Sequence, residues 1–335
     1  MTSGAHPGPG ASAGPGTGIL AVDSGGSGVR VALGSAGRGA LGRRSSAVPV
    51  RTGTRGIDLV HLMEQLVPLV RALAAETGAP PPTTAVVGVA GLATLGAALR
   101  AELPSALARE FGVRTTALAA DAVTAYAGAL GVRPGAVVAA GTGLIAVGMD
   151  LTAWQRADGW GHLLGDCGGG AWIGRAGLEA ALRAHDQRPG GSAALLARAE
   201  ERFGPMAALP GQLYPRPDRP AVLASFAPLV AECAQDDPVA AGILRTAARH
   251  VAESAAAVCP PGGEPRIALT GGLFALGDPL LVPLEDELAR RLPHALRVPA
   301  EGDPLDGAVR VAAGLAAGAL GLPREETLLS VLSSG

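Results

Sequence analysis

The apolar residues of this chain follow two spacings, and each spacing predicts a different kind of element. Short apolar runs, most of which end at glycines, predict buried strands at 19–33 (two strands around a glycine turn), 85–90, 115–120 (leading to Asp121), 136–149 (again two strands) and 266–270. Apolar residues three or four positions apart predict helices at 57–77, 95–111, 122–130, 172–184, 221–259 (two helices), 280–292 and 306–320. Strands and helices that alternate in this way are typical of an α/β fold.

The order of elements repeats from about residue 131 onward. A hairpin with a glycine turn opens the chain at 19–33, and a second one follows at 136–149, each with helices and strands after it. The repeat predicts two related α/β halves with a cleft between them, at 18–130 and 131–335. We expect that the final helix can pack back on the first half.

The composition narrows the class of protein. The 335 residues carry a formal net charge of −2 and no basic stripe, so a nucleic-acid partner is not expected. The chain has no lysine, which excludes a P-loop lysine and a Schiff-base lysine. Three widely spaced cysteines predict neither a disulfide framework nor a zinc site, which fits a reducing cytoplasm.

No segment has the pattern of a targeting or membrane-spanning sequence. Residues 1–17 are rich in Gly, Pro, Ala and Ser, and we expect a disordered tail rather than a signal peptide there. The most apolar window, 136–149, is too short and too rich in glycine to cross a bilayer. We therefore expect a cytoplasmic protein without a membrane partner.

Three glycine turns that each follow an apolar run are the first candidates for chemistry. Backbone N–H groups approach phosphate oxygens closely where no Cβ intervenes, and nearby Ser and Thr hydroxyls complete a phosphate cradle. One such turn is often an ordinary hairpin turn, whereas three together indicate a nucleotide held from several sides. Asp23, just before the first turn, could hold a phosphate-bound Mg²⁺ directly or through water. The residues are Ser24, Gly25, Gly26 and Ser27 in the first turn, Gly141, Thr142 and Gly143 in the second, and Gly271 and Gly272 in the third.

These turns resemble the phosphate-one, phosphate-two and adenosine motifs of the actin-like ATPase and sugar-kinase superfamily. The stretch 159–174, which reads Gly-Trp-Gly-His-Leu-Leu-Gly-Asp-Cys-Gly-Gly-Gly-Ala-Trp-Ile-Gly, is more specific. It resembles the Gly-Trp-Gly, Gly-Asp-Glu-Gly-Ser and Trp-Ile-Gly signature of N-acetylglucosamine kinases in the BadF/BadG/BcrA/BcrD-type ATPase family. The resemblance runs from about 19 to 317. It implies two actin-like ATPase (ribonuclease H-like) domains with an interdomain cleft, and ATP and Mg²⁺ as cofactors.

Asp121 is the candidate catalytic base. It follows the strand predicted at 115–120 and opens a helix, a position where Asp also serves as a simple N-cap. The match of residues 121–125 to the Asp-Ala-x-x-Ala pattern of the resembling kinases favours the base. Kinase chemistry needs a carboxylate that orients a sugar hydroxyl and accepts its proton.

The resemblance also implies a sugar site. Asp166 would accept hydrogen bonds from sugar hydroxyls, although a turn aspartate is the plainer interpretation. Trp160 would pack on the sugar ring or its acetamido methyl, whereas the plainer interpretation is a core tryptophan. The remaining candidates for sugar contacts are Gly161, Thr142, Gly143 and Thr54.

The sequence departs from the resembling kinases at three places, and these concern the substrate. The chain contains no Asn, whereas those kinases carry one in the loop that corresponds to 48–56; Thr52, Thr54 or Arg55 could substitute for it. Cys167 stands where the signature has Glu, and Gly28 where a Lys often follows the first phosphate turn.

The leading hypothesis is an ATP-dependent kinase that phosphorylates an amino sugar, most simply N-acetylglucosamine at its 6-hydroxyl. Glucosamine and N-acetylmuramic acid are alternative substrates. Two hypotheses from other classes stay open, a non-catalytic sugar-binding sensor and an ATPase that activates an electron-transfer partner. The apolar helices at 221–259 could form a homodimer surface or could simply be core.

Overall fold

The computed structural model describes residues 16–26, 28–53, 56–92 and 96–333. Ser27, Thr54 and most of the tail expected at 1–17 lie outside the described residues. The chain divides into two compact units. Unit 1 consists of residues 1–132, 151–153 and 301–335, and unit 2 of residues 133–150 and 154–300. The described part of the chain contains no helix that is both long and apolar enough to cross a membrane.

Unit 1 is built on a six-stranded mixed sheet in the order β13-β7-β6-β1-β2-β3. The first three strands form an antiparallel meander, β6 and β7 extend it in parallel to β1, and β13 closes the edge antiparallel to β7. The strands are β1 (Gly18–Gly25), β2 (Gly28–Ser35), β3 (Gly39–Ser46), β6 (Pro82–Val89), β7 (Thr115–Ala120) and β13 (Leu329–Ser333), with a separate pair β4 (Thr52–Gly53) and β5 (Gly56–Ile57).

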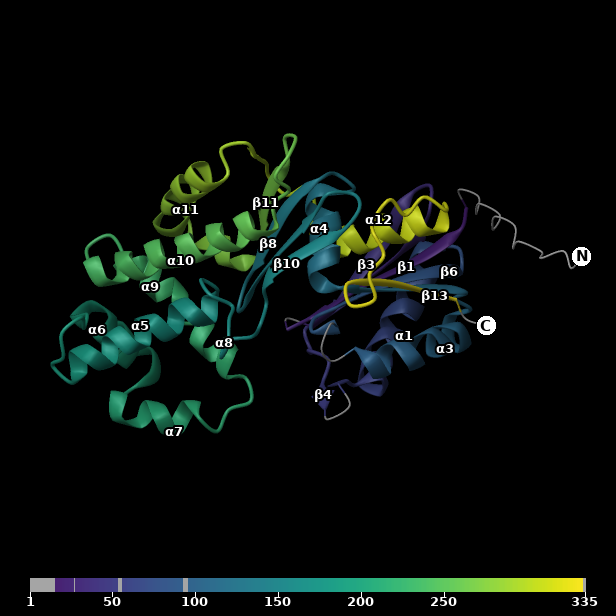
Figure 1. Ribbon diagram of the computed structural model, residues 1–335. Coiled ribbons are helices and arrows are strands. Elements are labelled where there is room, and N and C mark those ends of the chain that lie inside the picture. Colours follow the sequence, from purple (N-terminus) through teal and green to yellow (C-terminus); the bar gives the residue numbers. More distant parts are fainter. Residues whose placement is uncertain (1–15, 27, 54–55, 93–95, 334–335) are drawn as a thin grey trace, which may run out of the picture. The chain divides into compact units, whose positions relative to one another are not determined.

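Helices cover both faces of this sheet. In Figure 1, α12 (Pro304–Ala316) lies on one face and α1 (Leu59–Thr77) and α3 (Ala97–Phe111) lie on the other. The helix α4 (Asp121–Leu130) packs against α12. Because both faces are covered, the central strands are buried along nearly their whole length, and most of their buried side chains are Ile, Leu, Val and Ala.

Unit 2 repeats this sheet topology. Its five strands run in the order β10-β9-β8-β11-β12, which is again an antiparallel meander extended by two parallel strands. The strands are β8 (Gly135–Ala140), β9 (Leu144–Met149), β10 (Trp154–Asp158), β11 (Arg266–Thr270) and β12 (Leu296–Arg297). The long helix α10 (Pro238–Val258) packs across β8, β9 and β10 through small buried residues, mostly Ala and Val.

The other helices of unit 2 are α5 (Gly170–His185), α6 (Ala193–Phe203), α7 (Leu209–Leu213), α8 (Arg219–Ala224), α9 (Ala227–Cys233) and α11 (Asp278–Arg291), with short 3₁₀ turns at η1 (Met206–Ala208) and η2 (Gly272–Leu276). Of these helices, α5, α9 and α11 pack against α10, while α6 and α8 pack against α5 (Figure 1).

The two hairpins and the repeat expected from the sequence are confirmed by the pairing of β1 with β2 and of β8 with β9. The expectation of two helices over 221–259 was wrong, since α8 ends at Ala224 and two further helices follow. The helix expected at 306–320 instead spans Pro304–Ala316: a capping box fixes its start before residue 306, and it ends four residues before 320. The Asp303 carboxylate accepts the Asp306 N–H there, and the Asp306 carboxylate accepts the Asp303 N–H.

Candidate functional site

The first glycine turn, in unit 1, leaves backbone exposed where the hairpin reverses. An added Cβ at Gly25 or Gly26 would have no described atom within 4 Å, and neither residue has a positive φ. Packing and backbone conformation therefore do not require glycine at these two positions. Gly28 differs, because its φ is +123° and its Cβ would lie 2.0 Å from the Ser46 carbonyl oxygen. Open space at Gly25 and Gly26 is what the approach of a phosphate group needs.

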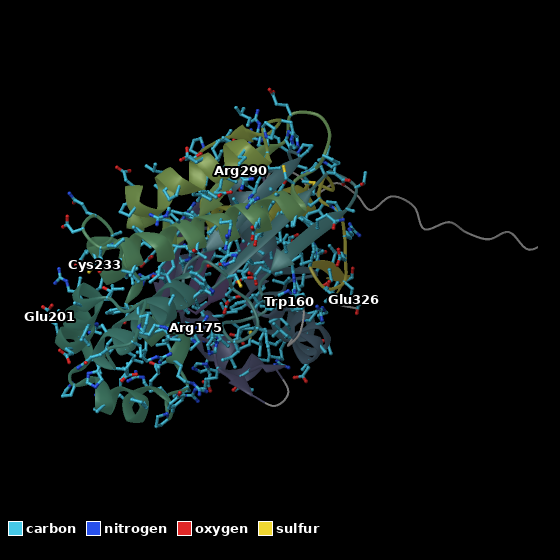
Figure 2. The ribbon with its side chains drawn as sticks, turned by 60° about the vertical axis from the view of Figure 1, so that its left-hand side comes forward. Trp160, Arg175, Glu201, Cys233, Arg290 and Glu326 are labelled. Carbon is cyan, nitrogen blue, oxygen red and sulfur yellow. The ribbon has the colours of Figure 1, made fainter. Side chains whose placement is uncertain are left out.

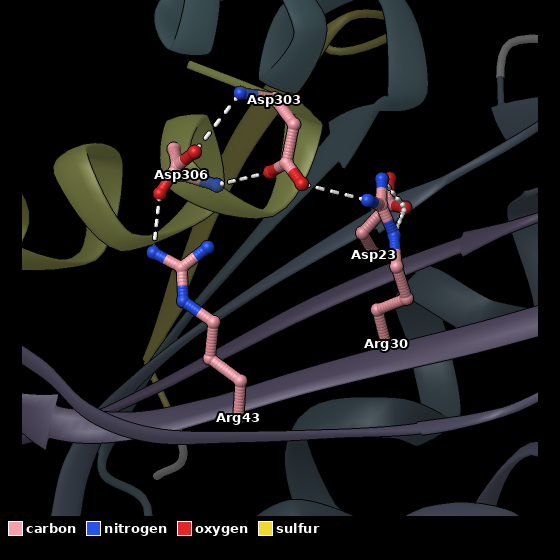
Figure 3. Close-up of polar contacts among 5 residues, drawn as sticks. All are labelled: Asp23, Arg30, Arg43, Asp303 and Asp306. Atoms are coloured by element: carbon pink, nitrogen blue, oxygen red, sulfur yellow. Dashed lines mark hydrogen bonds and ion pairs between the residues drawn. The ribbon is translucent and has the colours of Figure 1, made fainter. Parts of the chain in front are cut away.

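Asp23 is buried at the end of β1 and is held by an arginine. The Nε and Nη2 atoms of Arg30 lie 3.0 and 2.7 Å from Asp23 Oδ2, and Nη1 lies 2.8 Å from Asp303 Oδ2 (Figure 3). Burial raises the pKa of the Asp23 carboxyl above its ordinary value, and the Arg30 charge opposes this rise. Arg30 thus connects the first turn to the N-terminus of α12.

The residues around Asp23 are compatible with a magnesium ion that is held mainly by phosphate. Both hydrogen bonds from Arg30 end on Oδ2, and Oδ1 accepts none from the described residues. No group of three or more His, Cys, Asp or Glu side chains in the described chain could hold a metal. Mg²⁺ is often bound by one or two carboxylates together with phosphates and water, so a single free oxygen is sufficient. The assignment of Asp23 to the metal stays a prediction.

Asp121 is the first residue of α4 and follows β7 directly. Its Oδ1 accepts the Ala122 N–H at 2.9 Å, while the N-cap position itself belongs to Ala120. Burial raises the pKa of the Asp121 carboxyl to about 6; the Ala122 hydrogen bond opposes this, and the charge of Asp23 adds to it. A carboxyl with a pKa near neutrality is suited to accept a proton at physiological pH.

The second and third glycine turns lie against each other at the ends of β8 and β11. Gly271 has a φ of +102°, and an added Cβ there would lie 2.2 Å from the Ala140 carbonyl oxygen. The N-terminus of α5 is bound to the second turn, because Gly170 N–H donates to Gly141 O at 2.9 Å and Ala171 N–H to Thr142 O at 2.8 Å. Gly141 and Gly272, like Gly25 and Gly26, have open space where a Cβ would be.

The loop between β10 and α5 carries the remaining candidates. The Oδ1 atom of Asp166 accepts the Gly161 N–H at 3.0 Å, and a Cβ on Gly143 would lie 2.4 Å from Asp166 Oδ2. The structure therefore places Asp166, Gly161 and Gly143 together. Burial raises the pKa of Asp166, and its hydrogen bonds, led by that from Gly161, oppose the rise. Asp158, the last residue of β10, was not among the candidates from the sequence. Its carboxylate accepts backbone N–H groups of this loop.

Trp160 is not a core residue. Its side chain, labelled in Figure 2, belongs to a residue that is 64% exposed. The Arg156 guanidinium carbon lies 4.3 Å from the centroid of its ring. An exposed indole ring can pack on the apolar face of a sugar. Cys167 has its pKa raised, mainly by burial and then by Asp158, so it is not an activated thiol.

The comparisons with known proteins identify the family. A sequence profile of the BadF/BadG/BcrA/BcrD ATPase family matches residues 20–309. The chain belongs to this family. The resemblance stated from the glycine turns and the tryptophan loop is thereby confirmed, and the chain is a member of a family that binds ATP.

Solved structures share the fold of this BadF/BadG/BcrA/BcrD family member. A proposed N-acetylglucosamine kinase from Chromobacterium violaceum is 27% identical with a TM-score of 0.70, over 88% of this chain and 99% of that one. Another from Porphyromonas gingivalis is 18% identical with a TM-score of 0.67 and the same coverage, 88% and 99%. A ROK family glucokinase from Streptomyces griseus, in complex with glucose and AMPPNP, is 20% identical with a TM-score of 0.51, over 88% and 98%. The expected two-domain actin-like ATPase fold is confirmed.

A curated relative matches a shorter part of this ATPase. The N-acetylmuramic acid/N-acetylglucosamine kinase of Clostridium acetobutylicum is 42% identical over 69 residues, which is 20% of this chain. The match spans 22% of the length of that relative.

Proposed function

We propose that this BadF/BadG/BcrA/BcrD family member is an ATP-dependent sugar kinase that converts N-acetylglucosamine to N-acetylglucosamine 6-phosphate. The observation that carries the proposal is the Asp121 carboxyl, which lies at a strand end with a pKa of about 6, in the same unit as an open glycine turn. The names of the Chromobacterium violaceum, Porphyromonas gingivalis and Clostridium acetobutylicum proteins support the choice of sugar. Glucosamine and N-acetylmuramic acid are the alternative substrates.

In the proposed reaction, the oxygen of the sugar 6-hydroxyl forms a bond to the γ-phosphorus of ATP, and Asp121 accepts the proton of that hydroxyl. The bond from the γ-phosphorus to the β–γ bridging oxygen breaks, and ADP leaves. The backbone N–H groups at Gly25, Gly26, Gly141 and Gly272 bind phosphate or adenosine, together with Ser24, Ser27, Thr142 and Gly271. Mg²⁺ bound near Asp23 would offset the phosphate charge.

The sugar is assigned to unit 2 in this proposal. Asp166 accepts hydrogen bonds from two hydroxyls, Trp160 packs on the ring, and Gly161, Thr142 and Gly143 contribute backbone or hydroxyl contacts. Thr54 of unit 1 is a further candidate for a sugar contact. The substrate, the metal and a homodimer in the cytoplasm stay predictions.

An ADP-release assay tests the proposal. Wild-type protein and the Asp121→Asn variant are assayed with ATP and Mg²⁺ and with N-acetylglucosamine, glucosamine, N-acetylmuramic acid, N-acetylmannosamine or glucose. Asp278→Asn is the matched control, because Asp278 is likewise the first residue of a helix, α11. We expect release that depends on N-acetylglucosamine, is lost in Asp121→Asn and is kept in Asp278→Asn.

Two outcomes would contradict the proposal. ADP release without sugar, unaffected by Asp121→Asn, would favour an ATPase that activates an electron-transfer partner. Sugar binding by calorimetry without any turnover would favour a sensor.

A further inference from the structure

The loop from Asp158 to Gly169 is closed by one carboxylate that belongs to none of the motifs named so far. Asp158 is the last residue of β10. Its Oδ1 accepts the Asp166 N–H at 2.6 Å, and its Oδ2 accepts the Cys167 N–H at 2.8 Å. Both oxygens therefore bind consecutive backbone N–H groups eight and nine residues further along the chain, and the loop is fixed at both ends.

The backbone at both ends of the loop is in the left-handed region. Asp158 has a φ of 59° and Asp166 a φ of 54°, values that most residues other than glycine avoid. Gly165 leaves room for the carboxylate, because a Cβ there would lie 2.4 Å from Asp158 Oδ1. An aspartate at a position where glycine would be less strained indicates that its side-chain hydrogen bonds are what hold this conformation.

This conformation determines where Asp166 points. The Asp158 hydrogen bond fixes the Asp166 amide, and the Asp166 carboxylate then accepts the Gly161 N–H and lies against Gly143 of the second glycine turn. Arg156, two residues before Asp158 on the same strand, stacks over Trp160. Asp166, Gly161 and Trp160, which are assigned to the sugar, thus all lie on the loop that Asp158 closes.

We infer that Asp158 is a positioning residue for the sugar site, and that it acts by fixing the Asp166 amide and closing the loop that carries Trp160 and Gly161. This inference rests on the proposed function. Both oxygens of Asp158 are bound to backbone N–H groups, those of Asp166 and Cys167. Asp158 therefore acts through Asp166 and not by contact with the sugar. Its loss should therefore weaken sugar binding while ATP binding is retained, which a general loss of stability would not do.

The test compares Asp158→Asn with Asp237→Asn. Asn tolerates a left-handed backbone but offers one acceptor oxygen, so one of the two N–H groups loses its partner. Asp237 is a matched control in unit 2, because both of its oxygens also accept hydrogen bonds: Oδ1 accepts the Val239 and Ala240 N–H groups at 2.8 and 2.9 Å, and Oδ2 accepts the Ser192 hydroxyl at 2.6 Å. Steady-state kinetics give the KM for N-acetylglucosamine, the KM for ATP and kcat, and circular dichroism checks that each variant is folded.

We expect Asp158→Asn to raise the sugar KM on the order of tenfold or more, with the ATP KM within about twofold of wild type. Asp237→Asn should leave both KM values unchanged. Should Asp158→Asn fail to fold, Asp158→Gly keeps the left-handed backbone and is expected to show the same rise.

The inference is overturned if the sugar KM of a folded Asp158 variant equals that of wild type, or if the sugar and ATP KM values rise equally. A wild-type protein without any sugar-dependent turnover would be a different failure, since it contradicts the proposed function and with it any role in a sugar site.

Discussion

The two units have the same sheet topology but carry different chemistry at the strand ends. Unit 1 has the strand order β3-β2-β1-β6-β7 followed by β13, and unit 2 has the equivalent order β10-β9-β8-β11-β12. In unit 1, two strand ends carry the carboxyls Asp23 and Asp121, and burial raises the pKa of both. In unit 2, the ends of β8 and β11 carry glycine turns, and the carboxyl at the end of β10, Asp158, is bound to backbone N–H groups of the loop that follows. A shared topology therefore places strand ends, while local side chains decide what each end can do.

The comparison separates two kinds of glycine as well. Each unit has a glycine at its turns with a positive φ and with backbone where a Cβ would be, Gly28 in unit 1 and Gly271 in unit 2, and the fold requires these two. Each unit also has open glycines, such as Gly26 and Gly141, that the fold does not require. A ligand is expected at the open glycines. At the required glycines, another backbone segment packs too closely for a Cβ.

The largest expected effect concerns the carboxylates of the two units. Asp121→Asn should lower kcat by about 10²–10⁴-fold with little change in the sugar KM, because it removes the proton acceptor. Asp166→Asn should instead raise the sugar KM and change kcat less. Steady-state kinetics at saturating ATP separate the two results. Equal effects of both variants on kcat would show that the division of roles between the units is wrong.

The glycine turns give the next largest effect. Gly271→Ala places a methyl group against the Ala140 carbonyl at a positive φ, and we expect a loss of about 3 kcal/mol in the free energy of unfolding. Gly141→Ala should cost under about 1 kcal/mol, since its Cβ meets open space, and should raise the ATP KM. Urea unfolding and ATP titration measure the two quantities. A Gly141→Ala variant with unchanged ATP affinity would remove that turn from the nucleotide site.

The sequence was sufficient where the signal is local. The hairpins around Gly25 and Gly141 were recognisable because apolar runs stop at glycines, and α1 because Leu62, Leu66 and Leu73 recur at helical spacing. The strand β3 was missed, since it is a half-exposed edge strand that contains Arg43 and Arg44 and lacks an apolar face.

Contacts between distant positions could not be predicted from the sequence. The ion pair between Arg30 and Asp303 joins residues 273 positions apart, and no local pattern marks it. Asp158 is only eight residues from Asp166, but its role depends on left-handed backbone at both residues, which periodicity does not reveal.

The ion pairs of Arg30 and Arg43, which lie near the N-terminus of α12, give a smaller effect (Figure 3). Arg30→Gln leaves the buried Asp23 carboxylate without its partner, and we expect a loss of about 1–3 kcal/mol in the free energy of unfolding. Arg43→Gln breaks the ion pair with Asp306. Because the side chains of Arg43 and Asp306 are 46% and 30% exposed, this should lower the free energy of unfolding by only about 0–1 kcal/mol. Thermal unfolding at low and high salt compares them. Equal losses of unfolding free energy in the two variants would mean that the burial of Asp23 does not make its pair with Arg30 more stabilising than the exposed pair of Arg43.

The smallest effect is a pH-dependent change in stability at Asp121. Its pKa is raised from 3.8 to about 6, so between these values the folded protein keeps a proton that the unfolded chain has released. The contribution of Asp121 to the free energy of unfolding therefore falls as pH rises from 3.8 to about 6 and stays low above that. Asp121→Asn does not titrate, and it should be more stable than wild type by on the order of 1 kcal/mol at pH 7, with no gain below pH 4.

Thermal unfolding of wild type and Asp121→Asn across this pH range measures the difference, and Asp278→Asn again serves as the control. The same carboxyl should make kcat/KM of the wild type fall about tenfold per pH unit below about pH 6, because the protonated form cannot accept the hydroxyl proton. A stability gain in Asp121→Asn that is the same at pH 4 and pH 7 would show that Asp121 is not a buried charge. The contrast drawn between the carboxyls of unit 1 and the loop of unit 2 would then fail at its central residue.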